Sequence, residues 1–152
     1  MTANQKVLPT DTPLKSRANY LPVNELAQFA VEAILSKKGT DIVVMDMRAV
    51  SGVADIFIIC SGSSELQIKA IAEAVRMEIK ENASELPWHS EGLTTLQWVL
   101  LDYVDLVVHI FNEEKRTFYD LERLWGDAPK EDVAEDTIVE SIAILQSGES
   151  DK

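Results

Sequence analysis

The hydrophobic residues recur along the chain with two different periods, and together these predict helices alternating with strands. From Asn24 to Gly39 the apolar positions follow one helix face, so we expect Asn24 as the N-cap and Gly39 as the C-terminal cap of a first helix. Residues 63–83 predict a longer second helix that begins with a capping box formed by Ser64 and Gln67. The buried stripe of this second helix should consist of Ile68, Ile71, Ala72, Val75 and Ile79.

Four further apolar runs have the length and composition of strands. Residues 41–47 and 55–62 are rich in Ile and Val, and the first run is apolar almost throughout, as in a strand covered on both faces. Residues 98–103 and 105–111 lie so close together that they predict a hairpin, and a helix over residues 113–125 should follow. The core-facing residues of that helix should be Phe118, Leu121 and Trp125. The pattern therefore predicts an α/β fold with helices flanking a β-sheet, which must be mixed because it contains a direct hairpin.

The length of 152 residues is suited to one domain with tails. We divide the chain into a flexible, proline-containing N-terminal arm (residues 1–22), a folded domain (residues 23–128) and an acidic C-terminal segment (residues 129–152). Within the acidic segment, helical spacing connects Ile138, Ile142 and Leu145. This spacing allows either a short docked helix or a tail that folds only on a partner.

The formal net charge of −12 narrows the range of partners. An acidic chain repels nucleic-acid phosphates, so we expect no binding to nucleic acid through a basic surface, and a basic protein is the better electrostatic match. The single cysteine, Cys60, excludes an intrachain disulfide and favours a reducing compartment such as the cytoplasm. An organelle transit peptide is disfavoured because prolines interrupt the arm, and no apolar run approaches the ~20 residues of a membrane span.

Asp105 and His109 are the obvious acid–base pair, and their geometry argues against catalysis. Four residues apart on one strand, they share a face, but their backbones are ~13 Å apart at ~3.3 Å per residue. If Tyr103 and Val104 form a two-residue turn, Trp98 lies opposite His109, and we expect this histidine to pack against the indole ring.

The segment from Cys60 to Glu65 suggests a second kind of enzyme. A strand, a Gly-Ser turn and a helix start can cradle a phosphate, as in nucleotidyltransferases, which also hold Mg²⁺ with a D-x-D pair. The nearest acidic pair here, Asp102 and Asp105, straddles a turn instead. His89, His109 and Cys60 lack the spacing of a metal site, so no metal or cofactor is expected.

One ordered combination of motifs resembles a known family. The motifs are Ala-Asp-x-Phe from Ala54, Ser-Gly-x-Ser from Ser61, Trp-x-x-x-Asp from Trp98, Val-His-x-Phe from Val108 and Tyr-x-Leu-Glu-x-Leu-Trp from Tyr119. In this order they resemble the ribosomal silencing factor family (RsfS, also called Iojap), over roughly residues 26–128.

The resemblance implies both a fold and a function. The fold is similar to that of nucleotidyltransferases without the metal-binding acids, and family members are not enzymes. They bind a basic ribosomal protein on the subunit-joining face of the large ribosomal subunit, block association with the small subunit and repress translation. Family docking residues correspond to Trp98 and Tyr119, with Asp102 and Tyr103 beside them at the hairpin tip.

Two hypotheses therefore stand at this stage: a binding factor for the large subunit, and a nucleotidyltransferase-like enzyme that binds nucleotides. The monomer and the homodimer both remain open. The sequence departs from the family at Val104, where a glycine is usual in the hairpin turn, and a β-branched residue disfavours the positive φ of such a turn.

Overall fold

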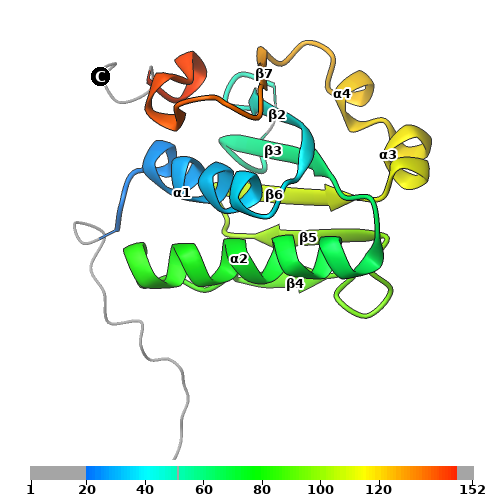
Figure 1. The fold of residues 1–152 in the computed structure, drawn as a ribbon. Coiled ribbons are helices and arrows are strands. Elements are labelled where there is room, and N and C mark those ends of the chain that lie inside the picture. Colours follow the sequence, from blue (N-terminus) through cyan, green and yellow to red (C-terminus); the bar gives the residue numbers. More distant parts are fainter. Residues whose placement is uncertain (1–19, 51, 147–152) are drawn as a thin grey trace, which may run out of the picture.

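The computed structural model of the protein describes residues 20–50 and 52–146, and the predicted N-terminal arm therefore falls almost entirely outside the described residues. Figure 1 shows a sheet with helices on both of its faces. The elements in chain order are α1 (Val23–Ser36), β2 (Thr40–Asp46), β3 (Ile56–Ser61), α2 (Glu65–Ala83), β4 (His89–Glu91), β5 (Trp98–Asp102), β6 (Leu106–Phe111), α3 (Glu113–Tyr119), α4 (Leu121–Leu124), β7 (Lys130–Val133) and the 3-10 turns η2 (Val139–Ser141) and η3 (Ala143–Gln146).

The sheet has the strand order β4-β5-β6-β3-β2-β7. Its central pair, β3 and β6, is parallel, and the other neighbours are antiparallel. Strands β3 and β6 can be parallel because α2, β4 and β5 lie between them in the sequence, which gives the chain enough length to cross back before β6 begins. The predicted α/β fold with a mixed sheet is confirmed.

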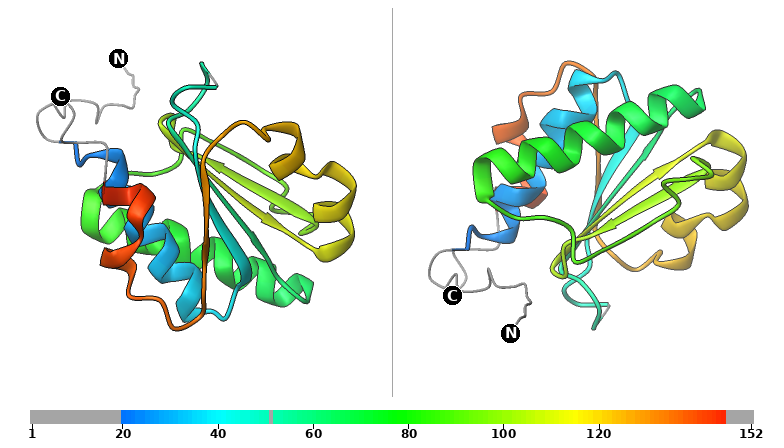
Figure 2. Two further views of the ribbon diagram at one scale, coloured as in Figure 1. Left: turned by 90° about the horizontal axis from the view of Figure 1, so that it is seen from above. Right: turned by 90° about the horizontal axis from the view of Figure 1, so that it is seen from below.

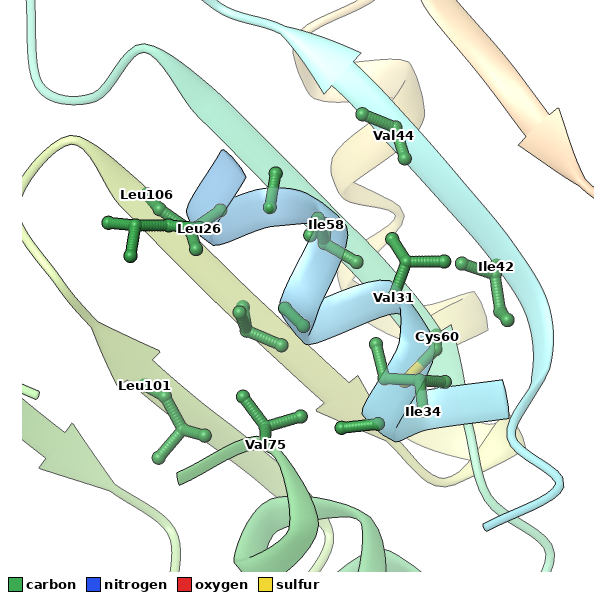
Figure 3. Close-up of a cluster of buried hydrophobic side chains, with 14 of the residues drawn as sticks. Leu26, Val31, Ile34, Ile42, Val44, Ile58, Cys60, Val75, Leu101 and Leu106 are labelled. Atoms are coloured by element: carbon green, nitrogen blue, oxygen red, sulfur yellow. The ribbon is translucent and has the colours of Figure 1, made fainter. Parts of the chain in front are cut away.

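Helices α1 and α2 cover one face of the sheet (Figure 2), and the larger hydrophobic core lies between them and the strands. Figure 3 shows some of its side chains, with Val31 and Ile34 of α1 close to Ile58 and Cys60 of β3. The stripe predicted for α2 is buried at all five positions. Burial raises the pKa of the Cys60 thiol to about 12, so this cysteine is a packing residue.

The start of α2 is fixed by side-chain caps. The Ser64 hydroxyl accepts the Gln67 backbone N–H at 3.0 Å, as the capping box predicts. The reciprocal contact differs, because Gln67 Oε1 accepts from the N–H of Ser63 rather than from that of Ser64. The amide of Gln67 also donates to the carbonyls of Lys37 and Lys38, which ties α2 to the end of α1.

Neither predicted cap of α1 lies where the sequence placed it: the N-cap is two residues earlier, and the left-handed residue at the other end is one residue earlier. Pro22 is the N-cap, with extended φ and ψ of −60° and 150°, and Asn24 is buried inside the first turn. Proline suits this position because it already has the φ that the helix start requires. At the other end Lys38 takes the left-handed conformation, with φ 65°, while Gly39 donates its N–H to Ile34 O at 2.9 Å.

The opposite face of the sheet is covered only in part, by α3 and α4. The single helix predicted over residues 113–125 is wrong, because Asp120 breaks it with φ 46°. The break lets Arg116 reach across it: its guanidinium pairs with Glu122 at 2.7 Å and donates to Ser61 Oγ at 2.9 Å. It also turns Phe118 outward, 75% exposed, where the sequence predicted a core residue.

The acidic C-terminal segment takes part in the fold up to residue 146. Strand β7 pairs with β2 at the edge of the sheet, an element that the sequence analysis did not predict. The segment beyond it docks as 3-10 turns: Ile142 and Leu145 are buried and Ile138 is exposed. Glu131 of β7 accepts the backbone N–H groups of Ala143 and Ile144 and so caps η3. Among the described residues, no helix combines the length and the apolar character that crossing a bilayer demands.

Candidate docking surface

The hairpin of β5 and β6 carries most of the predicted site residues, in a register that differs from the prediction. Trp98 pairs with Phe111 and Leu100 pairs with His109, whereas the two-residue turn placed Trp98 opposite His109. The connection runs over residues 103–105, and the register is shifted by two. Val104 at its centre has φ 78°, the left-handed conformation that the sequence marked as unfavourable for valine.

A shift of two residues keeps every side chain on its predicted face, because strands alternate with period two. Trp98 and His109 therefore still meet, as diagonal neighbours across the two strands. The Trp98 Nε1–H donates to His109 Nδ1 at 3.2 Å, and the ring centroids are 6.0 Å apart. The predicted packing of the histidine against the indole is confirmed.

Five rings form a continuous aromatic cluster on this face of the sheet. The Trp98 indole stacks on Phe111 at a centroid distance of 4.9 Å and contacts Tyr119 of α3 at 4.6 Å. His109 lies on the inner side of the cluster, where Phe57 meets it edge-on at 4.8 Å. The cluster joins β3, β5, β6 and α3, so the position of Trp98 is set from several elements at once.

His109 is neutral at physiological pH. It is 4% exposed, and burial alone lowers its pKa from 6.5 to about 3. Since Nδ1 accepts the indole N–H, the proton of the neutral ring is on Nε2. Within the described part of the chain, Nε2 has no hydrogen-bond partner.

The outer side of the cluster reaches the protein surface. We use the term aromatic surface for Trp98, Leu100, Phe118 and Tyr119, which lie on β5 and α3. Trp98 and Leu100 are half-buried, Tyr119 is 43% exposed, and the Phe118 ring meets that of Tyr119 edge-on at 5.0 Å. Two of these residues, Leu100 and Phe118, were not predicted from the sequence. Leu100 was signalled by its period-two spacing from Trp98, whereas Phe118 had no signal because the helix break was not foreseen.

The two remaining predicted residues occupy different faces of the hairpin. Asp102 lies on the same face as Trp98 and Leu100, and its Oδ1 accepts the Val104 N–H at 2.8 Å. Tyr103 is 5% exposed and packs into the core beneath α1 and α2, where burial raises the pKa of its phenol. The structure therefore brings Asp102 to the aromatic surface and does not bring Tyr103 there.

The features that suggested an enzyme have other roles in the structure. Two donors of the Gly-Ser turn that could meet a phosphate are occupied: Gln67 Oε1 accepts both the N–H and the hydroxyl of Ser63. Asp105 is an exposed turn residue. The pKa of Asp55 is raised, first by its own partial burial and second by the nearby charge of Asp105. Within residues 20–50 and 52–146, no group of three or more His, Cys, Asp and Glu side chains is arranged to hold a metal ion.

A pocket between α1, β2, α3 and β7 is acidic. Its lining includes six carboxylates and two cations, and one of the cations, Arg116, is already paired with Glu122. Such a lining disfavours the phosphates of a nucleotide. The acidic side chains are Asp41, Glu113, Asp120, Glu122, Asp132 and Glu135.

Comparisons with known proteins agree with the fold and the motifs. The profile of the family described as "Ribosomal silencing factor during starvation" matches residues 21–151, so the chain belongs to the ribosomal silencing factor family. A protein of Halalkalibacterium halodurans called ribosomal silencing factor RsfS is 44% identical over 105 residues, which are 69% of this chain and 89% of that protein. A protein of Bacillus subtilis with the same name is 41% identical over 108 residues, 71% of this chain and 91% of that one.

Solved structures show the same fold. The crystal structure of a protein from Chromobacterium violaceum superposes with a TM-score of 0.67 at 35% identity and covers 70% of this chain and 88% of its own. The family profile also matches the segment that forms β7 and the 3-10 turns, whereas the motifs in the sequence reach only to about residue 128.

Proposed function

We propose that the chain docks through its aromatic surface onto a basic protein on the subunit-joining face of the large ribosomal subunit. Docked there, it blocks association with the small subunit and represses translation. The observation that carries this proposal is the pair of Trp98 on β5 and Tyr119 at the end of α3: their ring centroids are 4.6 Å apart, Trp98 is half-buried and Tyr119 is 43% exposed. Membership of the ribosomal silencing factor family supplies the class of partner.

The composition of the aromatic surface supports a protein contact. Tryptophan and tyrosine are enriched among the residues that dominate binding energy, since each buries a large area with few rotatable bonds. Here both rings are held by neighbours before any partner arrives, which lowers the entropic cost of binding. In this proposal Asp102 lies within the contact, and Tyr103 supports the hairpin from the core side.

The net charge of −12 supports a basic partner. Opposite charges raise the rate of encounter and make it depend on salt, whereas burial of the aromatic rings determines how long the complex lasts. We therefore expect the association rate to fall as salt rises, with a smaller change in the dissociation rate.

The proposed activity is steric and involves no chemical step. A folded domain of this size is about 30 Å across, which is ample to fill a gap where two subunits must touch. The compartment we propose is the cytoplasm, in keeping with a single cysteine that is buried as a thiol.

Charge introduced at the aromatic surface tests the proposal. Trp98→Glu and Tyr119→Glu should each abolish co-sedimentation with purified large subunits, because a carboxylate in a desolvated contact costs several kcal/mol. Met77→Glu is the matched control: Met77 is 56% exposed on α2, which covers the opposite face of the sheet, and this variant should bind normally. If both aromatic variants fold, by circular dichroism, and still bind like the parent, the docking surface is elsewhere.

A further inference from the structure

His109 occupies an unusual place for a residue that only fills space. Its ring lies between Phe57, which meets it edge-on at 4.8 Å, and Phe111, which lies nearly parallel to it at 6.2 Å. Its Nδ1 faces the Trp98 indole and accepts the N–H at 3.2 Å. Because the imidazole is held between other rings, this acceptor is fixed in space.

The second ring nitrogen, Nε2, makes a histidine at this position unfavourable for the stability of the fold. Nε2 carries the proton of the neutral ring, and it has no partner within the described residues. A buried N–H without a partner lowers stability, and an aliphatic side chain of similar size would avoid the loss. Packing alone therefore does not explain a histidine here, whereas the acceptor that Nδ1 offers to Trp98 does.

The backbone of Trp98 is fixed independently of His109. Gly92, with φ 82°, lies so close to the start of β5 that a Cβ there would be 1.9 Å from the Trp98 carbonyl oxygen. The neighbouring Gln97 carbonyl accepts the Asn112 N–H at 2.9 Å. The indole ring packs against Phe111 and Tyr119, and the bond to Nδ1 adds a directional contact that fixes which edge of the ring faces inward.

We propose that His109 is the positioning residue of the aromatic surface: its Nδ1 holds the Trp98 indole in the orientation in which it meets the partner. This inference rests on the proposed docking function. It adds that the ordering of Trp98 is achieved during folding, so that binding does not have to supply it.

Two variants separate a positioning role from a packing role. One should keep the stability of the protein and weaken its binding, and the other should lower the stability and keep the binding. His109→Leu removes both ring nitrogens: the variant should be as stable as the parent or more stable, yet bind purified large subunits roughly fivefold to tenfold more weakly. His109→Asn places Oδ1 where Nδ1 was but leaves a cavity. It should be less stable and, below its unfolding temperature, bind within about twofold of the parent.

A measurement without ribosomes tests the same inference. The indole N–H signal of Trp98 in a ¹⁵N–¹H correlation spectrum is assigned by its disappearance in Trp98→Phe. The parent and His109→Asn should show it hydrogen-bonded and slow to exchange with water, and His109→Leu should show it shifted and fast to exchange. Should the leucine variant fail to fold, His109→Val replaces it, since β-branched residues suit a strand.

The outcomes distinguish this inference from the proposed function. If the unaltered protein does not bind large subunits, the docking function fails, and the indole signal still decides the role of His109. If His109→Leu keeps normal binding, or keeps the protected indole signal, His109 does not position Trp98. Binding by His109→Asn that is as weak as that of His109→Leu would overturn the inference as well.

Discussion

The burial of His109 makes a quantitative prediction for the pH dependence of stability. In the folded protein its pKa is lowered to about 3, and in the unfolded chain it returns to the ordinary 6.5. Below pH 6.5 the unfolded chain takes up a proton that the folded protein does not. The contribution of His109 to the free energy of unfolding is therefore fully present above pH 6.5. It is lost progressively as the pH falls towards 3, and below about pH 3 it changes no further.

The magnitude follows from the two pKa values. Between pH 7.5 and pH 5, the free energy of unfolding should fall by about 2 kcal/mol on account of His109 alone. Carboxylates also titrate in acid, so the comparison has to be made against a variant that lacks only this group. His109→Leu serves, because leucine carries no proton at any pH.

The assay is urea unfolding of both proteins at pH 7.5, 6.5, 5.5 and 5.0, followed by tryptophan fluorescence. The difference in free energy of unfolding, His109→Leu minus parent, should increase by about 2 kcal/mol towards the acid end. If the two curves run parallel, His109 is not buried as a neutral ring, and the reasoning about its proton on Nε2 fails with it.

Three further predictions concern single residues. Gly92→Ala should lower the free energy of unfolding by roughly 2–4 kcal/mol, because the added Cβ meets the Trp98 carbonyl and φ is 82°; a thermal midpoint unchanged from the parent would contradict this. Val104→Gly should raise the free energy of unfolding, measured with urea, by about 0.5–1 kcal/mol, because the strain of a valine with positive φ costs more than the extra chain entropy of a glycine. A less stable variant would show that the turn is unstrained. Cys60 should react with a thiol reagent at pH 8 only after urea is added, since it is fully buried with a pKa of about 12, and rapid reaction of the native protein would argue against that burial.

The sequence predicted the regular elements well wherever hydrophobic periodicity determined them. The stripe of α2 and the strands β2 and β3 are long apolar patterns whose burial is set by their own spacing. The contact of Trp98 with His109 was also correct although the register was not. An error of two residues in a hairpin leaves each side chain on its face and turns a direct neighbour into a diagonal one.

The errors lie where tertiary contacts override local signals. Nothing in the sequence marks Asp120 as a break, since it is neither glycine nor proline; the contact of Arg116 with Glu122 accompanies the break. Strand β7 reads Lys-Glu-Asp-Val, a charged segment without strand propensity, and it is a strand because β2 offers it an edge. Phe118 was placed in the core only because the helix was assumed to continue.

Subunit joining, followed by light scattering or gradient sedimentation, tests the central claim most directly. Large subunits are titrated with the protein before small subunits are added, and in a parallel series the protein is added after joining. The account predicts that joining falls in proportion to the large subunits occupied and needs no nucleotide, that preformed ribosomes resist because the docking site is covered, and that Trp98→Glu has no effect. Inhibition at strongly substoichiometric protein, or a requirement for ATP or GTP, would contradict steric occlusion.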